Sequence, residues 1–526
     1  MKKVSALAIA LSLCAVLPAL AAAPQPANPV VRTADGSVSG QTDPSTHVAS
    51  FKGLPFAAPP VGDLRWRAPR PPHSWKGVRD GSHFAPSCMQ RVHGTFLPWT
   101  REFLVQNQVS EDCLYLNVWT PRTGMTADLP VIVFIPGGAF TEGSGSVPIY
   151  NGANLAATGM VVVTINYRLG VFGFLAYPGL TAESPHHASG DYGLLDQIAA
   201  LRWVQRNIQA FGGNPHNVTV WGQSAGAFSV DALLVSPLPR GLFQRAQADS
   251  GLSIASVGMP DLKTAEQTGL RFAAQHHADS LKALRSISAA DLMPAPGDQF
   301  RFGPDIDGWV LPATLDALNQ TPTGSDVPVV TGYQANDSML FTPPIRSKKD
   351  FDDWVSRRYG SMAAEFERLY PGGSLQQMQL SVVESNRDRD RVSMFLWAKA
   401  RLLHHHSAIY TYFFDRAIPW PQHPEFGAFH SGELPYFFRN LQLLDRPWQP
   451  IDHHVSDTAS AYLKAFTATG DPNAHGLPHW PAVNPASPGT MEIGGKTHSM
   501  PLASNARYEF WIGYFHSQQG KDAPPF

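Results

Sequence analysis

The chain has 526 residues, of which 43% are hydrophobic, and its formal net charge at pH 7 is −2. A chain of this length can bury a large core in one or two domains. The near-neutral charge balance argues against nucleic acid and anionic membranes as partners, because both select clustered positive charge.

The first residues have the pattern of an export signal. Two lysines precede an apolar stretch, Val4–Leu17, which is too short for a typical membrane span, and an A-x-A cleavage sequence ends at Ala21. We therefore expect residues 1–21 to be removed and the mature chain to be periplasmic or secreted. No other segment has about 18 uninterrupted apolar residues, so we expect no membrane span.

Removal of that segment leaves two cysteines, Cys88 and Cys113. Outside the cytoplasm two thiols most often pair, although two buried free thiols are the alternative. A disulfide between them would close a loop of about 25 residues, worth roughly 3.5 kcal/mol in the chain-entropy description.

The first half of the chain alternates between predicted strands and helices. Continuous apolar runs at Pro130–Ile135 and Met160–Asn166 indicate central strands that are buried on both faces. Over Gly193–Ile208, apolar residues recur at helical spacing. Further strands are expected at Ser37–Gly40 and Leu114–Trp119, and another is expected late in the chain at Ala408–Phe414.

Later segments are helical and more polar, from about 265 to 292 and from 350 to 406, with an isolated strand, Val327–Thr331, between them. This distribution predicts an α/β fold with a large, mostly parallel central sheet flanked by helices. The polar helical segments are interpreted as cap insertions, and residues 22–526 as a single domain.

The most informative segment is Val218–Ala227. Its β-branched run predicts a strand, the run ends in Gly-Gln-Ser-Ala-Gly, and a predicted helix follows from Ala227. Strand, tight turn and helix form the context of a nucleophile elbow, in which glycines at 222 and 226 let the strand and the helix approach closely. The pentapeptide alone occurs by chance, but this context indicates Ser224 as a nucleophile.

A serine hydroxyl needs a base, and the base needs an acid that orients it. In α/β-hydrolases the acid and then the histidine follow the serine along the chain. Asp337 stands in the loop after strand Val327–Thr331, and His430 stands in the loop after the strand that ends at Phe414. A solvated turn aspartate is the alternative for Asp337. The competing clusters at His404–His406 and at positions 453–454 are interpreted as solvated helix ends.

Acyl transfer also needs backbone N–H donors for the oxyanion. Strand Pro130–Ile135 runs into a Pro-Gly-Gly-Ala-Phe sequence whose small residues allow close approach to a ligand. This predicts donor amides within that sequence, together with the amide of Ala225 beside the nucleophile.

Taken together, these segments resemble the type-B carboxylesterases, a group that also contains the cholinesterases and the bacterial para-nitrobenzyl esterases. The matching segments run through nearly the whole mature chain. They are Phe51–Pro60, Ser110–Trp119, Asn166–Phe174, Ala210–Pro215, the elbow and the loops that hold Asp337 and His430.

The resemblance implies an α/β-hydrolase fold with Ser224 as nucleophile, His430 as base and Asp337 as acid. It also implies an oxyanion hole and a disulfide, and it places two further residues beside the site. These are Gly138, Ala139 and Ala225 for the hole, Cys88 and Cys113 for the family's first disulfide, Glu433 for a glutamate that follows the histidine, and Gln223 beside the nucleophile.

The chain departs from the family pattern at several positions, which include the triad acid and two positions that bear on substrate. Most relatives have Glu where this chain has Asp337, which is one methylene shorter. Cholinesterases carry Glu where Gln223 stands, so the case for a cationic substrate is weaker here. Trp99 lies in the region that holds the choline-stacking tryptophan of cholinesterases, but at a different spacing from Cys113.

We therefore expect a serine carboxylic ester hydrolase that forms an acyl-enzyme on a small-molecule ester and needs no metal or cofactor. An amide, thioester, lactone or polyester substrate is the first alternative, and a non-catalytic cholinesterase-like binding protein is the second. The sequence leaves the natural ester and the oligomeric state open.

Overall fold

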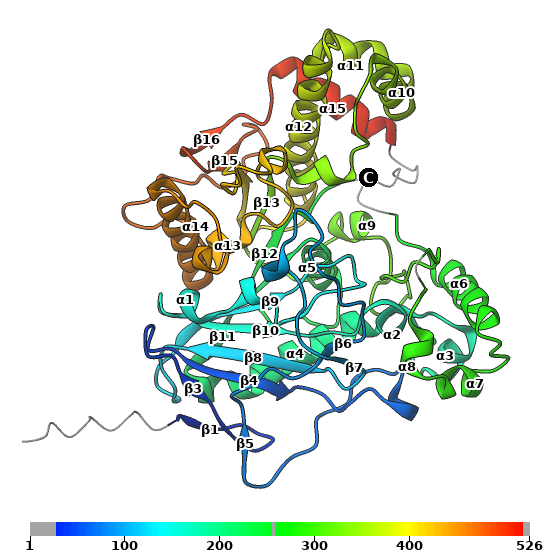
Figure 1. The fold of residues 1–526 in the computed structure, drawn as a ribbon, viewed down its shortest axis with the longest axis vertical. Helices are drawn as coiled ribbons and strands as arrows, with labels where there is room; N and C mark the ends of the chain where they lie inside the picture. The colour runs from blue at the N-terminus through cyan, green and yellow to red at the C-terminus, as the bar shows by residue number, and fades with distance from the viewer. Residues whose placement is uncertain (1–27, 255–257, 296, 519–526) are drawn as a thin grey trace, which may run out of the picture.

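The structure is a computed structural model that describes residues 28–254, 258–295 and 297–518 (Figure 1). The predicted signal segment, residues 1–21, lies outside the described residues. Throughout these ranges, no helix combines the length and apolarity that crossing a membrane requires.

An eleven-stranded sheet organises the fold. The strands from β10 through β9, β11, β12, β13 and β14 to β15 pair in parallel, whereas β8, β4 and β3 at one edge and β16 at the other pair antiparallel. From edge to edge the strands are β16 (Thr497–Met500), β15 (Thr490–Ile493), β14 (Ile409–Phe414), β13 (Val329–Gln334), β12 (Arg245–Asp249), β11 (Gly213–Gln223), β9 (Leu129–Ile135), β10 (Val161–Ile165), β8 (Tyr115–Thr120), β4 (Ala49–Pro55) and β3 (Gln41–Thr42).

Two small sheets stand apart from the main one. The first contains β1 (Val30–Arg32), β2 (Ser37–Ser39) and β5 (Val78–Asp80), and the second pairs β6 (Ser87–Cys88) with β7 (Val109–Ser110). The strand predicted at Ser37–Gly40 therefore exists, but it lies outside the main sheet.

The predicted central strands are confirmed. Every residue of β10 is buried, as are the last five residues of β9, because helices cover both faces of the sheet. The predicted helix appears as α4 (Tyr192–Asn207), and its periodic apolar residues, Leu194, Ile198, Leu201 and Val204, are all buried.

The other helices are α1 (Ala153–Ala156), α2 (Gly170–Phe174), α3 (Pro178–Glu183), α5 (Ala225–Val235), α6 (Leu262–Gln275), α7 (Leu281–Ser286), α8 (Ala289–Leu292), α9 (Leu315–Asn319), α10 (Lys348–Tyr359), α11 (Ala363–Leu369), α12 (Leu375–Arg401), α13 (Leu434–Phe437), α14 (Pro450–Thr469) and α15 (Asn505–Gln518).

The polar helical segments form two separate groups. In Figure 1, α6, α7 and α8 lie at the lower right, and α10, α11, α12 and α15 gather at the top. The upper group has its own aromatic core, in which Tyr359 stacks on Phe366 and both pack near Trp511 of α15. The expectation of cap insertions on a mostly parallel sheet is confirmed, and the single domain over residues 22–526 stays a prediction.

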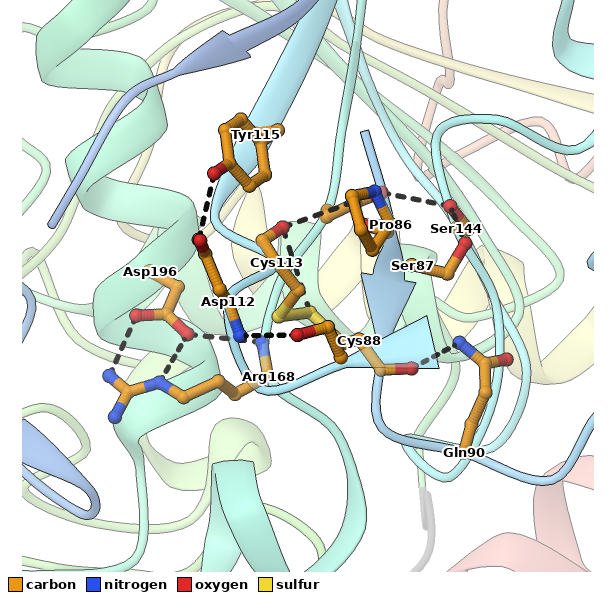
Figure 2. Close-up of a disulfide and its surroundings, with 12 residues drawn as sticks. Pro86, Ser87, Cys88, Gln90, Asp112, Cys113, Tyr115, Ser144, Arg168 and Asp196 are labelled. Carbon is orange, nitrogen blue, oxygen red and sulfur yellow. Dashed lines mark hydrogen bonds and ion pairs between the residues drawn. A yellow bond between two sulfur atoms is a disulfide. The ribbon is translucent and has the colours of Figure 1, made fainter. Parts of the chain in front are cut away.

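The structure joins Cys88 of β6 to Cys113, which lies just before β8 (Figure 2). Both cysteines are buried, and their Cα atoms are 4.9 Å apart. Beside the bond, Arg168 and Asp196 form a buried ion pair with N–O distances of 2.7 Å. The disulfide therefore closes the loop 88–113 against the core of the sheet.

We expect Cys113→Ser to lower the free energy of unfolding by about 3.5 kcal/mol, because the unfolded chain regains the entropy of the open loop. Chemical denaturation followed by circular dichroism measures the loss, and Cys14→Ser, within the segment predicted to be removed, is the control. Non-reducing peptide mapping of exported protein should recover the 88–113 pair. Two freely alkylated thiols there would contradict the assignment.

Candidate active site

Ser224 lies at the tip of a sharp turn between β11 and α5. Its backbone has φ 58° and ψ −125°, an uncommon conformation for a residue with a side chain. A Cβ on Gly222 would lie 2.1 Å from the Gly226 carbonyl oxygen, and a Cβ on Gly226 would lie 2.1 Å from that of Ile135. Only glycine fits at both positions, as the elbow pattern predicted, and the Ser224 side chain is left partly exposed.

Asp337 and His430 come together from two loops. His430 Nδ1 lies 2.7 Å from Asp337 Oδ1, and both side chains are buried. Since an ionised carboxylate only accepts hydrogen bonds, Nδ1 carries the proton in this contact and Nε2 has the lone pair. That nitrogen lies 3.3 Å from Nε2 of Gln223, the residue before Ser224, so the imidazole faces the elbow.

Asn336 holds the two loops together. Its amide donates to the Ala428 carbonyl at 2.9 Å, and it forms an isolated bridge with Phe429. A Cβ on Gly427, which has φ 57°, would lie 2.4 Å from Asn336 Oδ1. These contacts place the shorter aspartate within reach of His430.

The second oxygen of Asp337 has two further partners. Ser250 Oγ lies 2.5 Å from Oδ2, and the backbone N–H of Gln334 donates to the same oxygen at 3.2 Å. The sequence analysis missed Ser250 and Gln334. A usable signal exists, because Ser250 directly follows β12, Gln334 ends β13, and polar groups at the carboxyl ends of neighbouring parallel strands converge.

The competing histidines lie elsewhere. Exposed His404, His453 and His454 agree with the interpretation as solvated helix ends. His405 corrects it, because its ring is buried with Nε2 3.1 Å from the Thr321 carbonyl, and burial lowers its pKa.

The segment after β9 turns its backbone sharply. Gly138 has φ 115° and Ala139 has φ 54°, and the Gly138 carbonyl accepts hydrogen bonds from the amides of Thr141 and Glu142. Ala225 is the first residue of α5, and the first amides of a helix have no acceptor within the helix. The three amides predicted as donors thus lie in the turn after β9 and at the start of α5.

One cavity of about 420 Å³ contains these groups. Ser224, His430, Gly137, Gly138 and Ala139 all line it. Most of its remaining wall is apolar, made by Phe96, Leu97, Trp99, Phe103, Leu104, Val105, Val147 and Tyr150. The polar remainder comprises Gln90, Arg91, His93, Glu142, Gly143, Gln223 and Ser431.

Trp99 packs against His430, the predicted base. Its ring meets the His430 ring edge-on, with centroids 6.5 Å apart, and exposed Phe96 stacks on it at 5.6 Å. The tryptophan therefore forms part of the cavity wall, although its spacing differs from the cholinesterase pattern.

Gln90 links the disulfide loop to the backbone turn after β9. Its side-chain nitrogen donates to the Cys88 carbonyl at 2.9 Å (Figure 2). The same nitrogen donates to the Gly143 carbonyl at 2.9 Å, and the side-chain oxygen accepts from the Gly143 amide at 2.8 Å. A Cβ on Gly143 would lie 2.2 Å from the Gly137 carbonyl oxygen. The disulfide loop therefore buttresses the turn that carries the predicted donor amides.

Glu433 is fully buried but takes no part in the contact between His430 and Asp337. Neither of its carboxylate oxygens has a hydrogen-bond partner. Burial raises its pKa well above the usual value, and repulsion from Asp249 and Asp337 adds to the shift. In the described part of the chain, no cluster of three or more His, Cys, Asp or Glu side chains is arranged to hold a metal ion.

Known proteins resemble this chain over nearly all of its length. A model of the carboxylesterase family matches residues 27–511. The fumonisin B1 esterase of Sphingopyxis macrogoltabida is 36% identical over 475 residues, which cover 86% of this chain and 84% of that protein. The para-nitrobenzyl esterase of Bacillus subtilis (strain 168) is 36% identical over 486 residues, covering 86% and 92%.

Solved structures agree with these matches. A PNB esterase aligns with a TM-score of 0.74 at 32% identity, over 92% of this chain and 99% of the other. The carboxylesterase of Geobacillus stearothermophilus aligns with a TM-score of 0.76 at the same identity and coverage. The sheet, the elbow and these matches lead to one conclusion: the chain belongs to the carboxylesterase family and has its α/β-hydrolase fold.

Proposed function

We propose that this carboxylesterase works through an acyl-enzyme on Ser224, with His430 as the base and Asp337 as the acid that orients it. The observation that carries the proposal is the 2.7 Å contact between His430 Nδ1 and Asp337 Oδ1 beside the cavity that exposes Ser224. This contact fixes the tautomer in which Nε2 can accept a proton.

In the first half of the reaction, Ser224 Oγ attacks the ester carbonyl carbon while His430 Nε2 takes the hydroxyl proton. The carbonyl oxygen becomes an oxyanion, to which the amides of Gly138, Ala139 and Ala225 donate. The carbon–oxygen bond to the alcohol then breaks, and His430 gives its proton to the leaving oxygen. Asp337 stabilises the imidazolium that exists between these transfers.

In the second half, water attacks the acyl carbon and gives its proton to His430. The bond to Ser224 Oγ breaks, the serine regains the proton, and the carboxylic acid leaves. Atoms and protons balance without an external reactant, so the cycle needs only the ester and water.

The apolar cavity wall favours esters with uncharged groups. Gln223 contributes no charge next to the nucleophile, and the Trp99 ring packs edge-on against His430 in a cavity whose wall is mostly apolar. We therefore propose neutral, apolar small-molecule esters as the substrate class. The export pattern at residues 1–21 and the pairing of Cys88 with Cys113 support export as the location of the enzyme.

Labelling with a fluorophosphonate probe tests the nucleophile. The probe's phosphorus should bond to the serine oxygen with release of fluoride, and peptide mapping should find the adduct on Ser224. An adduct on another residue would contradict the assignment. A panel of p-nitrophenyl esters beside matched amides and thioesters tests the substrate class, with faster turnover of the esters expected.

A further inference from the structure

The Ser250 hydroxyl lies between two acceptor oxygens but has only one proton to donate. Ser250 Oγ lies 2.5 Å from Asp337 Oδ2 and 2.5 Å from Gln334 Oε1. Both neighbours are acceptors, and a serine hydroxyl has a single proton to donate. Whichever contact receives that proton, the other brings two acceptor oxygens together.

Exchanging the side-chain oxygen and nitrogen of Gln334 gives Ser250 one donor and one acceptor as neighbours instead of two acceptors. These two atoms are assigned by their hydrogen bonds, and Nε2 of Gln334 has no partner in its present place although it is buried. After the exchange, Nε2 donates to Ser250 Oγ, and Ser250 donates to the ionised carboxylate of Asp337. Both short contacts then join a donor to an acceptor.

The exchange turns Gln334 Oε1 toward Glu433, whose carboxyl group the Gln334 side chain adjoins. That buried oxygen now requires a donor, and an ionised carboxylate cannot supply one. Both oxygens of Glu433 are buried without a hydrogen-bond partner in the unexchanged arrangement. A protonated Glu433 satisfies both residues.

We propose that Glu433 is protonated at neutral pH and donates to Gln334 Oε1, at the far end of a directed chain that runs through Gln334 and Ser250 to Asp337. In this chain Glu433 is a positioning residue for the reaction assigned above to Ser224, His430 and Asp337, on which the proposal rests. Each donor in the chain points toward Asp337, so its carboxylate is held in place for His430.

The charges around Glu433 support its neutral form. Asp249 at the end of β12 and Asp337 repel its negative charge, and Tyr412 on β14 and Tyr150 are also close enough to interact with it electrostatically. Burial raises the pKa of Asp249 to about 7. Asp249 already accepts from the Trp221 indole and the Gln247 amide, so it is the member of the pair equipped to hold the negative charge.

The sign of the pH effect on stability follows from the raised pKa. Folded protein keeps the Glu433 proton at pH values where the unfolded chain, with an ordinary pKa of 4.5, has lost it. The free energy of unfolding therefore falls as pH rises from 4.5 toward the folded pKa. Glu433→Gln cannot ionise, so its free energy of unfolding should fall less over the same range.

Infrared difference spectroscopy of the resting enzyme tests the proton directly. We expect a carboxylic-acid carbonyl band at neutral pH that shifts when the protein carries ¹³C-labelled glutamate. The band should disappear in Glu433→Gln and persist in Asp249→Asn, the matched control. No isotope shift in the wild-type protein would overturn the proposal even if neither variant folds.

Kinetics test whether the donor matters for positioning. Glutamine can donate to Gln334 Oε1 and methionine cannot, so Glu433→Gln should have a kcat about tenfold or more above that of Glu433→Met, with similar KM values. Equal kcat values in the two variants would overturn the positioning role. Because the spectra need no turnover and fluorophosphonate labelling tests Ser224 separately, failure here is distinguishable from failure of the proposed mechanism.

Discussion

Ser224→Ala should lose ester hydrolysis by a factor on the order of 10⁴ to 10⁶, because no other hydroxyl stands at the tip of the elbow. The change removes one oxygen from a partly exposed side chain, so the fold and the free energy of unfolding should stay close to wild type. Steady-state hydrolysis of a p-nitrophenyl ester measures the loss.

Ser45→Ala provides a control on an exposed serine far along the chain from the elbow. Circular dichroism and the thermal midpoint should match wild type for both variants. Residual activity above about a tenth of wild type in Ser224→Ala, where a far larger loss is expected, would exclude Ser224 as the nucleophile.

Asp337→Asn should lower kcat by on the order of 10² or more, with KM little changed, since the loss falls on the transition state. Asparagine keeps the shape of the side chain but can present an N–H to His430 Nδ1. The imidazole is then held in the wrong tautomer, and its charged form has no counter-ion. Steady-state kinetics on a single ester gives both parameters.

Asp337→Glu is the matched variant, because it keeps the charge and restores the residue that most relatives carry. It should retain more activity than Asp337→Asn, although the Asn336 contacts hold the loop for the shorter side chain. Near-wild-type turnover in Asp337→Asn would move the acid elsewhere, and Glu433 would be the first alternative.

Local patterns predicted the parts of the fold that depend on local physics. The β-branched run of β10 is buried on both faces, and the periodic apolar residues of α4 are all buried, so the local sequence pattern was sufficient to predict both elements. The strand at Ser37–Ser39 was predicted as well, but its place in a separate small sheet was not. Sheet membership depends on pairing between distant segments, which a single sequence does not specify.

The candidate site likewise has a part that local sequence predicts and a part that depends on contacts between distant segments. Ser224 and its glycines lie within five residues, and their spacing encodes the turn. Ser250 and Gln334 are separated by 84 positions, and nothing local in either segment indicates that they meet. The two residues meet only because β12 and β13 end side by side in the folded sheet. The proposed hydrogen bond from Glu433 to Gln334 depends on the same arrangement.

The order of the strands along the chain has a consequence for biosynthesis. Ser224 follows β11, near the middle of the sequence, whereas His430 follows β14 and lies 207 positions from Gln223. A nascent chain therefore carries the proposed nucleophile long before the proposed base and acid can dock beside it. Under the proposed mechanism, the chain cannot form its acyl-enzyme until the segment beyond β14 has been made and folded.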